Sequence, residues 1–373
     1  MSKENRNSIR LIAVGDIMFG EHPVCLGHGI GSVIERHGCN YVFKKVQEIF
    51  SGADVLFGNL ENMFIDEPDT SNKFERKYLR PGTMCVNALK YAGFSVMNLA
   101  NNHALQHGLS ALTGTANILE QNEINHIGIA GRNSVLFDVG NIKIGLAGYC
   151  SDQQYEKETN YVEPIDLEKI SKDVRILREQ GADFVVVSLH WGDEFTEKPS
   201  IEQVEIGRRV IEVGANLILG HHSHVLQGIE EYKDGIIVYS LGNFIGDMHW
   251  SRRLRETMIL SLDVSKDAVL KYEIIPVIIN SNYQPKPMDV PEKDNLLSRV
   301  EQLSKELNSF SFEKPPYTRL EYKKNLKKMR NKNRMGMYRH YTLHLPVYSH
   351  EAAKEIFKFF FTNKINKLWG RRK

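Results

Sequence analysis

The feature that most constrains the fold of this sequence is a recurring pattern, in which a short apolar, β-prone run ends in a polar or glycine-rich tip. The run 9–14 ends in Gly15-Asp16, and the run 216–219 ends in a glycine followed by His-His-Ser-His. Alternating strands and helices predict an α/β fold, and strands that are apolar throughout predict sheets covered on both faces. Amphipathic stretches between the runs predict helices over 109–122, 167–180 and 201–213.

The polar tips are expected to share one rim of the fold, because ligands in α/β folds bind at the carboxyl ends of parallel strands. Imidazole, carboxylate and amide groups together are typical ligands of Mn, Fe, Zn or Ni, so we expect one or two divalent ions at this rim. Such an ion can polarise an ester or amide bond and activate water near neutral pH. The side chains that the rim would bring together are Asp16, Asn59, Glu61, Asn102, His103, His190, His222 and His224.

The His-His-x-His tip is the strongest indication of a metal site. A lone histidine at a strand end is most often structural. His222 and His224, however, would point to the same side of an extended segment. Two further residues have two interpretations each. Glu194 either orients one of the histidines or lies in a solvent-facing loop, and Asn243 either contacts substrate or belongs to a tight turn after a strand.

Six motifs occur in a fixed order along the chain. They are Gly15-Asp16, Gly58-Asn-Leu-Glu61, Asn101-Asn-His103, His190-Trp-Gly-Asp-Glu194, Gly220-His-His-Ser-His224 and Tyr239-Ser-Leu-Gly-Asn-Phe244. Together they resemble the bacterial CapA family, which is associated with capsule and poly-γ-glutamate biosynthesis. The resemblance covers about residues 9–247, and it depends on the six motifs in order rather than on any one of them.

The CapA family is in turn similar to calcineurin-like metallophosphoesterases, so the resemblance implies a four-layer α/β sandwich with a dinuclear metal site. It places Asn59 or Glu61 at the segment of the bridging carboxylate. It also makes His103 the general acid that protonates the leaving group. The residues at metal-ligand positions are Asp16, Asn59, Glu61, Asn102, His190, His222 and His224.

Three departures from the phosphoesterase and CapA patterns leave the number of ions open. Met18 stands where the phosphoesterases have a histidine, and Asn59 where they have the bridging aspartate. Gln106 stands near the place of an aspartate in the CapA pattern. Each change removes a ligand or an orienting carboxylate, so two ions, one ion and no ion are all consistent with the sequence.

Charge is distributed unevenly along the chain. Residues 314–373 carry 17 lysines and arginines against 3 acidic residues, although the net charge of the 373-residue chain is only +2. We expect a CapA-like metallophosphoesterase-fold domain over 1–280, a basic connecting region over 281–350 and a basic amphipathic helix over 351–373. Aromatic residues opposite lysines on that helix suit an anionic membrane surface, with docking onto the domain as the alternative. No nucleic-acid recognition module accompanies the charge, so we expect no nucleic-acid partner.

The resemblance to the CapA family implies a role in capsule or poly-γ-glutamate biosynthesis, with metal-dependent hydrolysis of a phosphoester or of an amide bond in poly-γ-glutamate. The alternative is a non-catalytic subunit that binds the polymer or capsule synthase subunits at the membrane. A third interpretation is an ordinary cytosolic phosphoesterase. The polar N-terminus and the lack of a long apolar stretch predict a cytoplasmic protein, peripheral at the inner membrane face.

Overall fold

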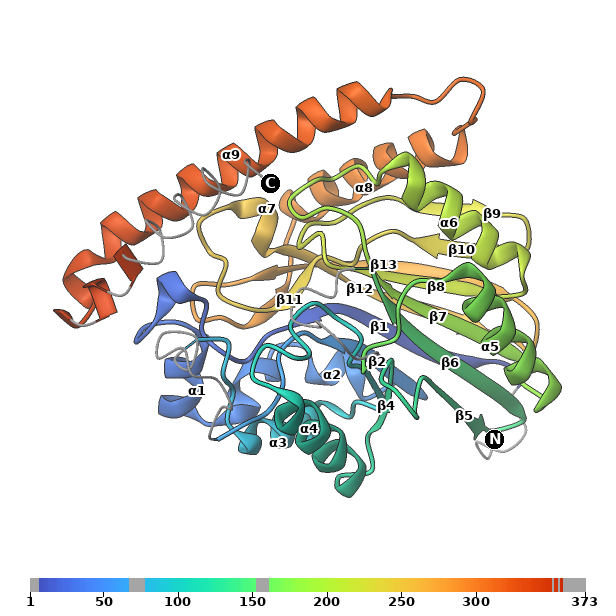
Figure 1. Cartoon of the computed structure of the whole chain (residues 1–373), viewed down its shortest axis with the longest axis horizontal. Helices are drawn as coiled ribbons and strands as arrows, with labels where there is room; N and C mark the ends of the chain where they lie inside the picture. The colour runs from blue at the N-terminus through green and yellow to red at the C-terminus, as the bar shows by residue number, and fades with distance from the viewer. Residues whose placement is uncertain (1–6, 67–77, 152–160, 351, 355, 358–373) are drawn as a thin grey trace, which may run out of the picture.

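Two β-sheets face each other, and helices cover their outer faces (Figure 1). The computed structural model describes residues 7–66, 78–151, 161–350, 352–354 and 356–357. Within these residues the predicted alternation of strands and helices is confirmed. The helices predicted over 109–122, 167–180 and 201–213 each end one residue earlier than expected.

The first sheet of the described chain has eight strands, in the order β14-β13-β12-β1-β2-β3-β4, with β11 paired to β1. The four strands β1 to β4 run parallel, and β12 to β14 add to them antiparallel. The bounds are β1 Ile9–Ile17, β2 Val55–Leu60, β3 Val96–Asn98, β4 Asn125–Ile127, β11 Asn243–Ile245, β12 Glu256–Val264, β13 Val269–Ile279 and β14 Pro285–Pro287.

The second sheet has six strands among the described residues, in the order β5-β6-β7-β8-β10-β9. Its central strands β6, β7, β8 and β10 are parallel. Both sheets therefore present the carboxyl ends of parallel strands. The bounds are β5 Ser134–Val139, β6 Ile142–Cys150, β7 Phe184–His190, β8 Leu217–His221, β9 Ile229–Tyr232 and β10 Gly235–Val238.

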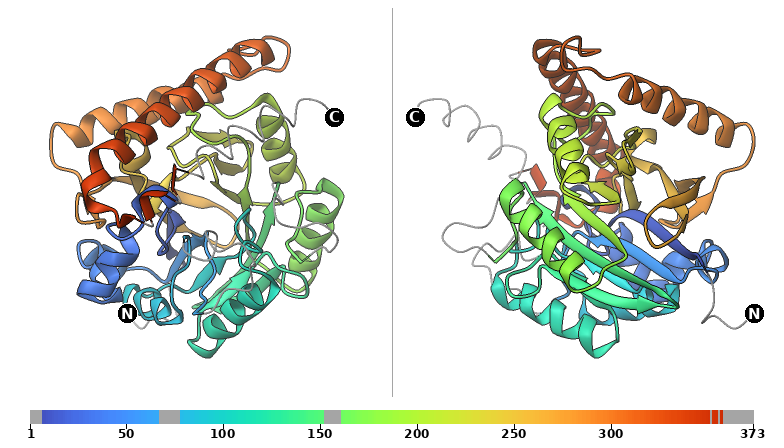
Figure 2. Two further views of the ribbon diagram at one scale, coloured as in Figure 1. Left: turned by 60° about the vertical axis from the view of Figure 1, so that its left-hand side comes forward. Right: turned by 90° about the vertical axis from the view of Figure 1, so that its right-hand side faces the viewer.

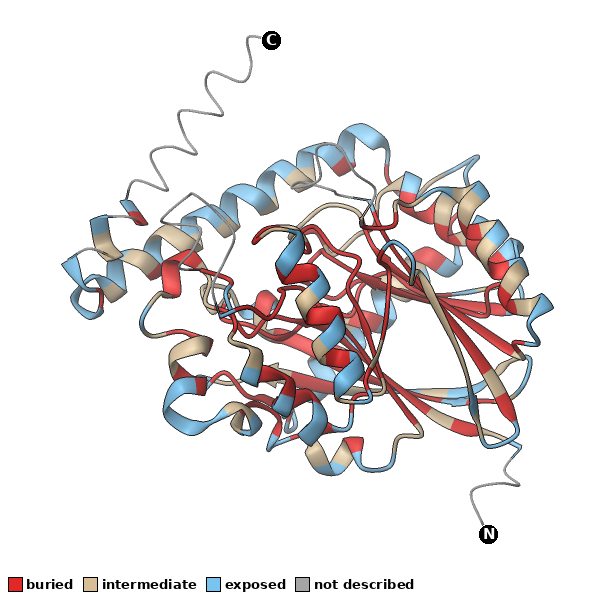
Figure 3. Ribbon diagram, turned by 60° about the horizontal axis from the view of Figure 1, so that its bottom comes forward, coloured by how far each residue is buried: buried red, intermediate tan, exposed pale blue. Residues whose placement is uncertain are grey.

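The core consists of three apolar layers, which follow from the alternation of side chains along buried strands. Leu11 of β1 and Val186 of β7 lie in the layer between the two sheets. Ile12 packs under the helices on the outer face of the first sheet, and Val187 packs under those on the outer face of the second. The order helix, sheet, sheet, helix confirms the predicted four-layer α/β sandwich, and the strands between the helices are largely buried (Figure 3).

The helices divide between the two outer faces and one edge. Helices α1 to α4 cover the first sheet, α5 and α6 cover the second, and α8 and α9 lie along one edge of the sandwich (Figures 1 and 2). The α-helices are α1 Ile30–His37, α2 Gln47–Phe50, α3 Val86–Ala92, α4 Leu109–Gln121, α5 Leu167–Glu179, α6 Ile201–Glu212, α7 Arg252–Arg255, α8 Glu292–Asn308 and α9 Arg319–His344. Short 3₁₀ helices are η2 Pro23–Cys25, η3 Cys39–Phe43, η5 Thr83–Cys85 and η6 Leu345–Val347.

The region after residue 280 is mainly helical. Helix α8 buries Leu296 and Val300 in the layer between the sheets, whereas α9 buries only Tyr322 and His340. The expected division of the chain at 280 and 350 stays a prediction. Most of the predicted helix 351–373 lies outside the described residues. Among the helices that the structure describes, none has the length and hydropathy needed to cross a membrane.

Candidate metal centre

The rim predicted from the strand tips exists, and both sheets contribute to it. Asp16 lies near the end of β1, Glu61 directly follows β2, and His190 ends β7. All three side chains are fully buried. The strands can meet closely because Gly15 has no side chain: a Cβ there would lie 1.9 Å from the carbonyl oxygen of Gly242. This close approach pairs β1 with β11 and fixes the backbone of Asp16 at the rim.

Two groups of side chains at this rim have the spacing of metal ligands. One contains Glu61, His190 and His222, and the other contains Asp16, Glu61 and His224. Within each group the ligand atoms lie within 4.8 Å of one another. Oε1 of Glu61 is 3.7 Å from Nε2 of both His190 and His224. Glu61 belongs to both groups, so its carboxylate occupies the position that a bridging ligand would take.

The unsatisfied polar atoms of the rim fit a divalent cation. Neither carboxylate oxygen of Glu61 has a hydrogen-bond partner within the described chain, and the same holds for Nδ1 of His222. Burial and the charge of Asp16 raise the pKa of Glu61 well above its usual range. Burying a carboxyl group without a partner is costly, because the group loses its hydration. A cation would supply the missing partner and remove the repulsion from Asp16.

The two histidines of the His-x-His pair reach the rim differently from the sequence expectation. Strand β8 ends at His221, and His222 and His224 adopt positive φ angles of 87° and 58°. The expectation of an extended segment is therefore wrong, and a sharply bent loop rather than strand alternation brings both rings to the rim. Positive φ at residues other than glycine costs about 1–3 kcal/mol, and such strain clusters at functional sites.

Asn59 acts as a hydrogen-bond donor to its neighbours at the rim. Its Nδ2 donates to Oδ1 of Asp16 at 2.8 Å and lies 3.2 Å from Nδ1 of His190. Its Oδ1 accepts from Nδ2 of Asn98 at 2.9 Å. The oxygen that would bind a metal is thus occupied, and Glu61 rather than Asn59 presents the free carboxylate. Sequence reasoning missed Asn98, which fits only because Gly148 lacks a Cβ; that atom would lie 2.3 Å from Oδ1 of Asn98.

Asn102 and His103 lie in the loop after β3, as the motif places them. Oδ1 of Asn102 is 2.9 Å from Nε2 of His190. The His103 ring lies 2.7 Å from Oε1 of Gln106 through its Nδ1. An amide oxygen only accepts hydrogen bonds, so Nδ1 of His103 carries the proton. Burial, opposed in part by Gln106, lowers the pKa of His103 to about 4.

His224 is held by groups on three sides. Its Nδ1 lies 2.9 Å from Oδ1 of Asn243 and 3.5 Å from Oδ2 of Asp16. Its Nε2 lies 4.0 Å from Oε1 of Glu194. The amide nitrogen of Asn243 donates to the carbonyl of Leu254 at 3.0 Å, so both ends of this predicted substrate-binding side chain bond within the protein. This geometry favours orientation of His224 as the role of Asn243.

His221 is a further rim residue to which the motif assigned no role. It is fully buried, and its Nδ1 lies 3.2 Å from Oδ1 of Asp16. Burial alone would raise the pKa of Asp16, but His221 and His224 outweigh burial and lower that pKa well below its usual range. Asp16 is therefore ionised at neutral pH, as a metal ligand must be.

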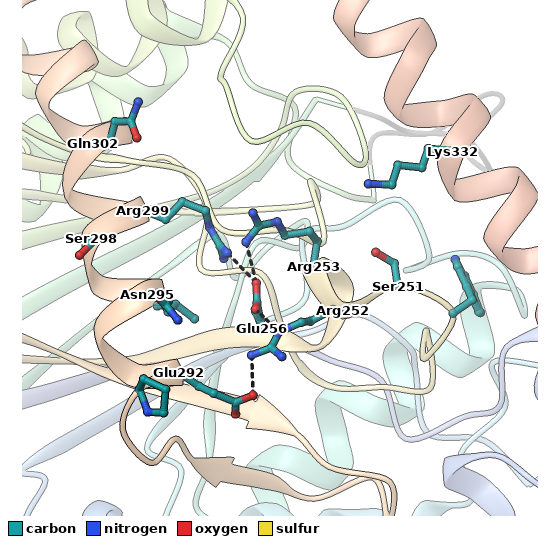
Figure 4. Close-up of a pocket in the computed structure, with 13 residues that line it drawn as sticks. Ser251, Arg252, Arg253, Glu256, Glu292, Asn295, Ser298, Arg299, Gln302 and Lys332 are labelled. Carbon is teal, nitrogen blue, oxygen red and sulfur yellow. Dashed lines mark hydrogen bonds and ion pairs between the residues drawn. The ribbon is translucent and has the colours of Figure 1, made fainter.

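A cavity of about 980 Å³ lies away from the rim, between α7, α8 and α9 (Figure 4). Arg252, Arg253 and Arg299 line it and converge on the buried Glu256, at 2.7, 2.9 and 2.7 Å. Arg253 and Arg299 also pair with Glu197. Because these arginine charges are balanced within the protein, the cavity is not a strongly cationic receptor, and none of the rim side chains lines it.

Comparisons with known proteins agree with the motifs. The family described as "Bacterial capsule synthesis protein PGA_cap" matches residues 10–248. The capsule biosynthesis protein CapA of Bacillus anthracis is 29% identical over 340 residues, which cover 87% of this chain and 80% of that protein. The PGA biosynthesis protein CapA of Bacillus subtilis is 29% identical over 307 residues, or 79% of this chain and 77% of that protein.

Similarity to solved structures is weaker. The calcineurin-like phosphoesterase YfkN of Bacillus subtilis has 11% sequence identity and a TM-score of 0.40, covering 79% of this chain and 97% of that chain. At this distance the description of the fold rests on the sheets and layers given above.

Proposed function

Since the chain belongs to the PGA_cap family of bacterial capsule synthesis proteins, we propose that it works in capsule or poly-γ-glutamate biosynthesis as a metal-dependent hydrolase. The bond to be cleaved is a phosphoester or an amide bond of an anionic polymer. One observation carries the proposal. Glu61 is a buried carboxyl group without a hydrogen-bond partner among the described residues, between two groups of metal-ligand side chains that share it.

Five side chains would hold one or two divalent cations of the Mn, Fe, Zn or Ni class. The predicted amide ligand Asn102 lies beside them, and Asn59 serves as a donor that fixes Asp16. A cation bound here would act as a Lewis acid toward a phosphoryl or carbonyl oxygen. The five proposed ligands are Asp16, Glu61, His190, His222 and His224.

His103 is proposed to move a proton during the reaction. Gln106 holds the proton on Nδ1, and we assign the other ring nitrogen, Nε2, as the atom that exchanges a proton with the substrate. The pKa of about 4 means that His103 is neutral at neutral pH and takes up a proton before it can give one to a leaving group.

The proposed partners follow from charge. An anionic polymer or phosphoester is the substrate, and capsule synthase subunits are the protein partners. The basic C-terminal region, with 17 lysines and arginines against 3 acidic residues over 314–373, is proposed to contact an anionic membrane surface. Failure of the full chain to sediment with anionic lipid vesicles at low salt would contradict that contact.

Metal content tests the proposed hydrolase directly. Elemental mass spectrometry of the purified wild type should find Mn, Fe, Zn or Ni, and the variant H222A/H224A should contain about one or two equivalents less. H350A is the matched control, because His350 is exposed and lies far along the chain from the rim. The same variants are then compared on phosphoesters and γ-glutamyl polymers.

An unchanged metal content in H222A/H224A would contradict the proposed hydrolase. If H222A/H224A holds as much metal as the wild type after incubation with each ion, the rim is not a metal centre. The proposed hydrolase would then be wrong. The non-catalytic subunit that binds polymer or assembles the synthase would be the better explanation of family membership.

A further inference from the structure

Three histidines outside the rim come together where the last turn of α9 meets the loop after η2. His340 and His344 are four residues apart, so they share one face of α9. Their rings stack at 4.0 Å between centroids, and His28 stacks on His344 at 4.7 Å with an interplanar angle of 7°. One ring nitrogen from each histidine lies within 4.8 Å of the others.

The ring nitrogens of this cluster are available for a metal. Nδ1 of His344 lies 2.8 Å from the carbonyl oxygen of His340. A carbonyl only accepts, so that nitrogen carries the proton and Nε2 of His344 carries a lone pair. Nε2 of His28 is buried and has no hydrogen-bond partner in the described chain. Nε2 of His340 lies 3.6 Å from the thiol of Cys25, which donates its hydrogen to the carbonyl of Asp247, so Nε2 carries the proton and Nδ1 of His340 carries the lone pair.

The cluster is partly withdrawn from solvent, since His340 is buried and His28 and His344 are half-buried. A carboxylate is close by: Glu21 accepts hydrogen bonds from the backbone of Gly27 and Gly29, at 2.7 and 2.9 Å, on either side of His28.

We propose that His28, His340 and His344 form a second metal site, which takes Zn²⁺ or a similar borderline divalent cation and fastens α9 to the segment after β1. Three imidazoles are a common zinc ligand set, and two histidines at i and i+4 on a helix are a recurrent part of it. Tetrahedral zinc needs nitrogens about 3.3 Å apart, so the three rings would have to turn out of their stacked arrangement to direct their lone pairs at one ion. Cys25 stays outside the ligand set, because its thiol donates to the carbonyl oxygen of Asp247 at 3.3 Å.

The packing of α9 gives this site a clear role. The helix spans 26 residues, and its buried residues are only Tyr322 near the start and His340 near the end. Most of the helix is exposed (Figure 3), and its apolar contacts with the domain come mainly from half-buried residues such as Leu326, Met337 and Tyr341. A metal bound by His28 and by the last turn would fix the end of α9 against the segment after β1. This role goes beyond the proposed hydrolase and requires no catalysis.

Zinc stoichiometry of full-length variants tests the second site. Each protein is stripped with a chelator, incubated with Zn²⁺, desalted and measured by elemental mass spectrometry. We expect H28Q/H344Q to bind about one equivalent of Zn²⁺ less than the wild type. The same two changes made in H222A/H224A should again remove about one equivalent, relative to H222A/H224A itself. H350Q, a change at an exposed histidine, should bind as much as the wild type. The proposal is wrong if H28Q/H344Q binds as much zinc as its parent in both backgrounds.

The two sites fail separately in this design. Loss of metal only in H222A/H224A would overturn the second site and leave the rim, whereas loss only in H28Q/H344Q would do the reverse.

If H28Q/H344Q does not fold, a second experiment on the wild type alone still tests the site. Zn²⁺ should slow carbethoxylation of His344 at least about threefold, measured by peptide mass spectrometry, and leave His37 and His350 unchanged. An unchanged rate at His344 would contradict the proposal.

Discussion

A buried amide replaces a carboxylate at one position of the rim, and this changes what the site needs. Nδ2 of Asn59 lies 2.8 Å from Oδ1 of Asp16, and Asn98 holds the other end of the amide. A carboxylate at position 59 would repel Asp16 across the same short distance unless a cation lay between them. Asn59 therefore lets the protein assemble the rim before a metal binds.

The variant N59D tests this interpretation. It should lower the free energy of unfolding by about 1–3 kcal/mol in the presence of chelator, because a donor to a buried carboxylate becomes a second buried carboxylate. A divalent cation should restore most of the loss. Thermal unfolding with and without metal measures both effects, with N282D at an exposed position as control. A loss of the same size with and without metal would show that Asn59 supports packing only.

The site residues that the sequence predicts are those at, or directly after, the carboxyl ends of apolar strands. Asp16, Glu61 and His190 are examples, because a strand end is visible in the hydropathy pattern and its carboxyl end locates the rim. The residues that the pattern does not reveal act through another side chain. Asn98 bonds to Asn59, and Gln106 bonds to His103. Such contacts depend on three-dimensional approach and leave no periodic signal.

At the scale of elements, α9 shows where sequence patterns stop being informative. The region 312–350 lacks a regular apolar stripe, because much of the helix faces solvent and only Tyr322 and His340 of it are buried. Its beginning is nevertheless coded locally. Thr318 accepts from the backbone of Glu321, and Glu321 accepts from the backbone of Thr318, which together form a capping box.

The first half of α9 also contacts Asp193, in the loop that follows β7. The Tyr322 hydroxyl donates to Asp193 at 3.0 Å, and Arg330 pairs with the same carboxylate at 2.8 Å. The variant D193A should loosen α9 by about 1 kcal/mol, since the contacts are half exposed, and proteolysis within α9 should become about fivefold faster. K324A removes an exposed charge of the same helix and is the control. Equal cleavage rates in D193A and wild type would mean that other contacts hold the helix.

For the whole molecule, the sequence predicts the layers but not how the strands divide between the sheets. Continuous apolar runs indicate buried strands with helices outside them. Nothing in those runs indicates that β1 to β4 join one sheet and β6 to β8 the other, or that the short β11 pairs with β1. The division follows from long-range pairing and from close approaches such as that of Gly15 to Gly242.

This division has a consequence for how a cation would act on the molecule. Asp16 and Glu61 come from the first sheet, and His190, His222 and His224 from the second, so a bound cation would join the two sheets at the rim. At the opposite end, where Ile9 pairs with Val264, apolar packing joins the sheets, together with polar contacts near the surface such as that between Lys266 and Asp183 at 3.7 Å. A cation should therefore stabilise the molecule unevenly.

Amide hydrogen exchange measures this unevenness. A divalent cation at about 100 times its dissociation constant stabilises the bound state by about 2.7 kcal/mol, so exchange at the rim should slow about 100-fold wherever opening releases the ion. The reporting amides are those of Asp16 and Met18, which donate to Gly242 and Ile245 at 2.9 Å. The amides of Ile9 and Val264 should slow much less, and none should respond in H222A/H224A. Uniform slowing of exchange would mean that the sheets separate only by global unfolding. Slowing confined to the rim would mean that the sandwich opens at the rim first and that the bound ion holds the two sheets together there.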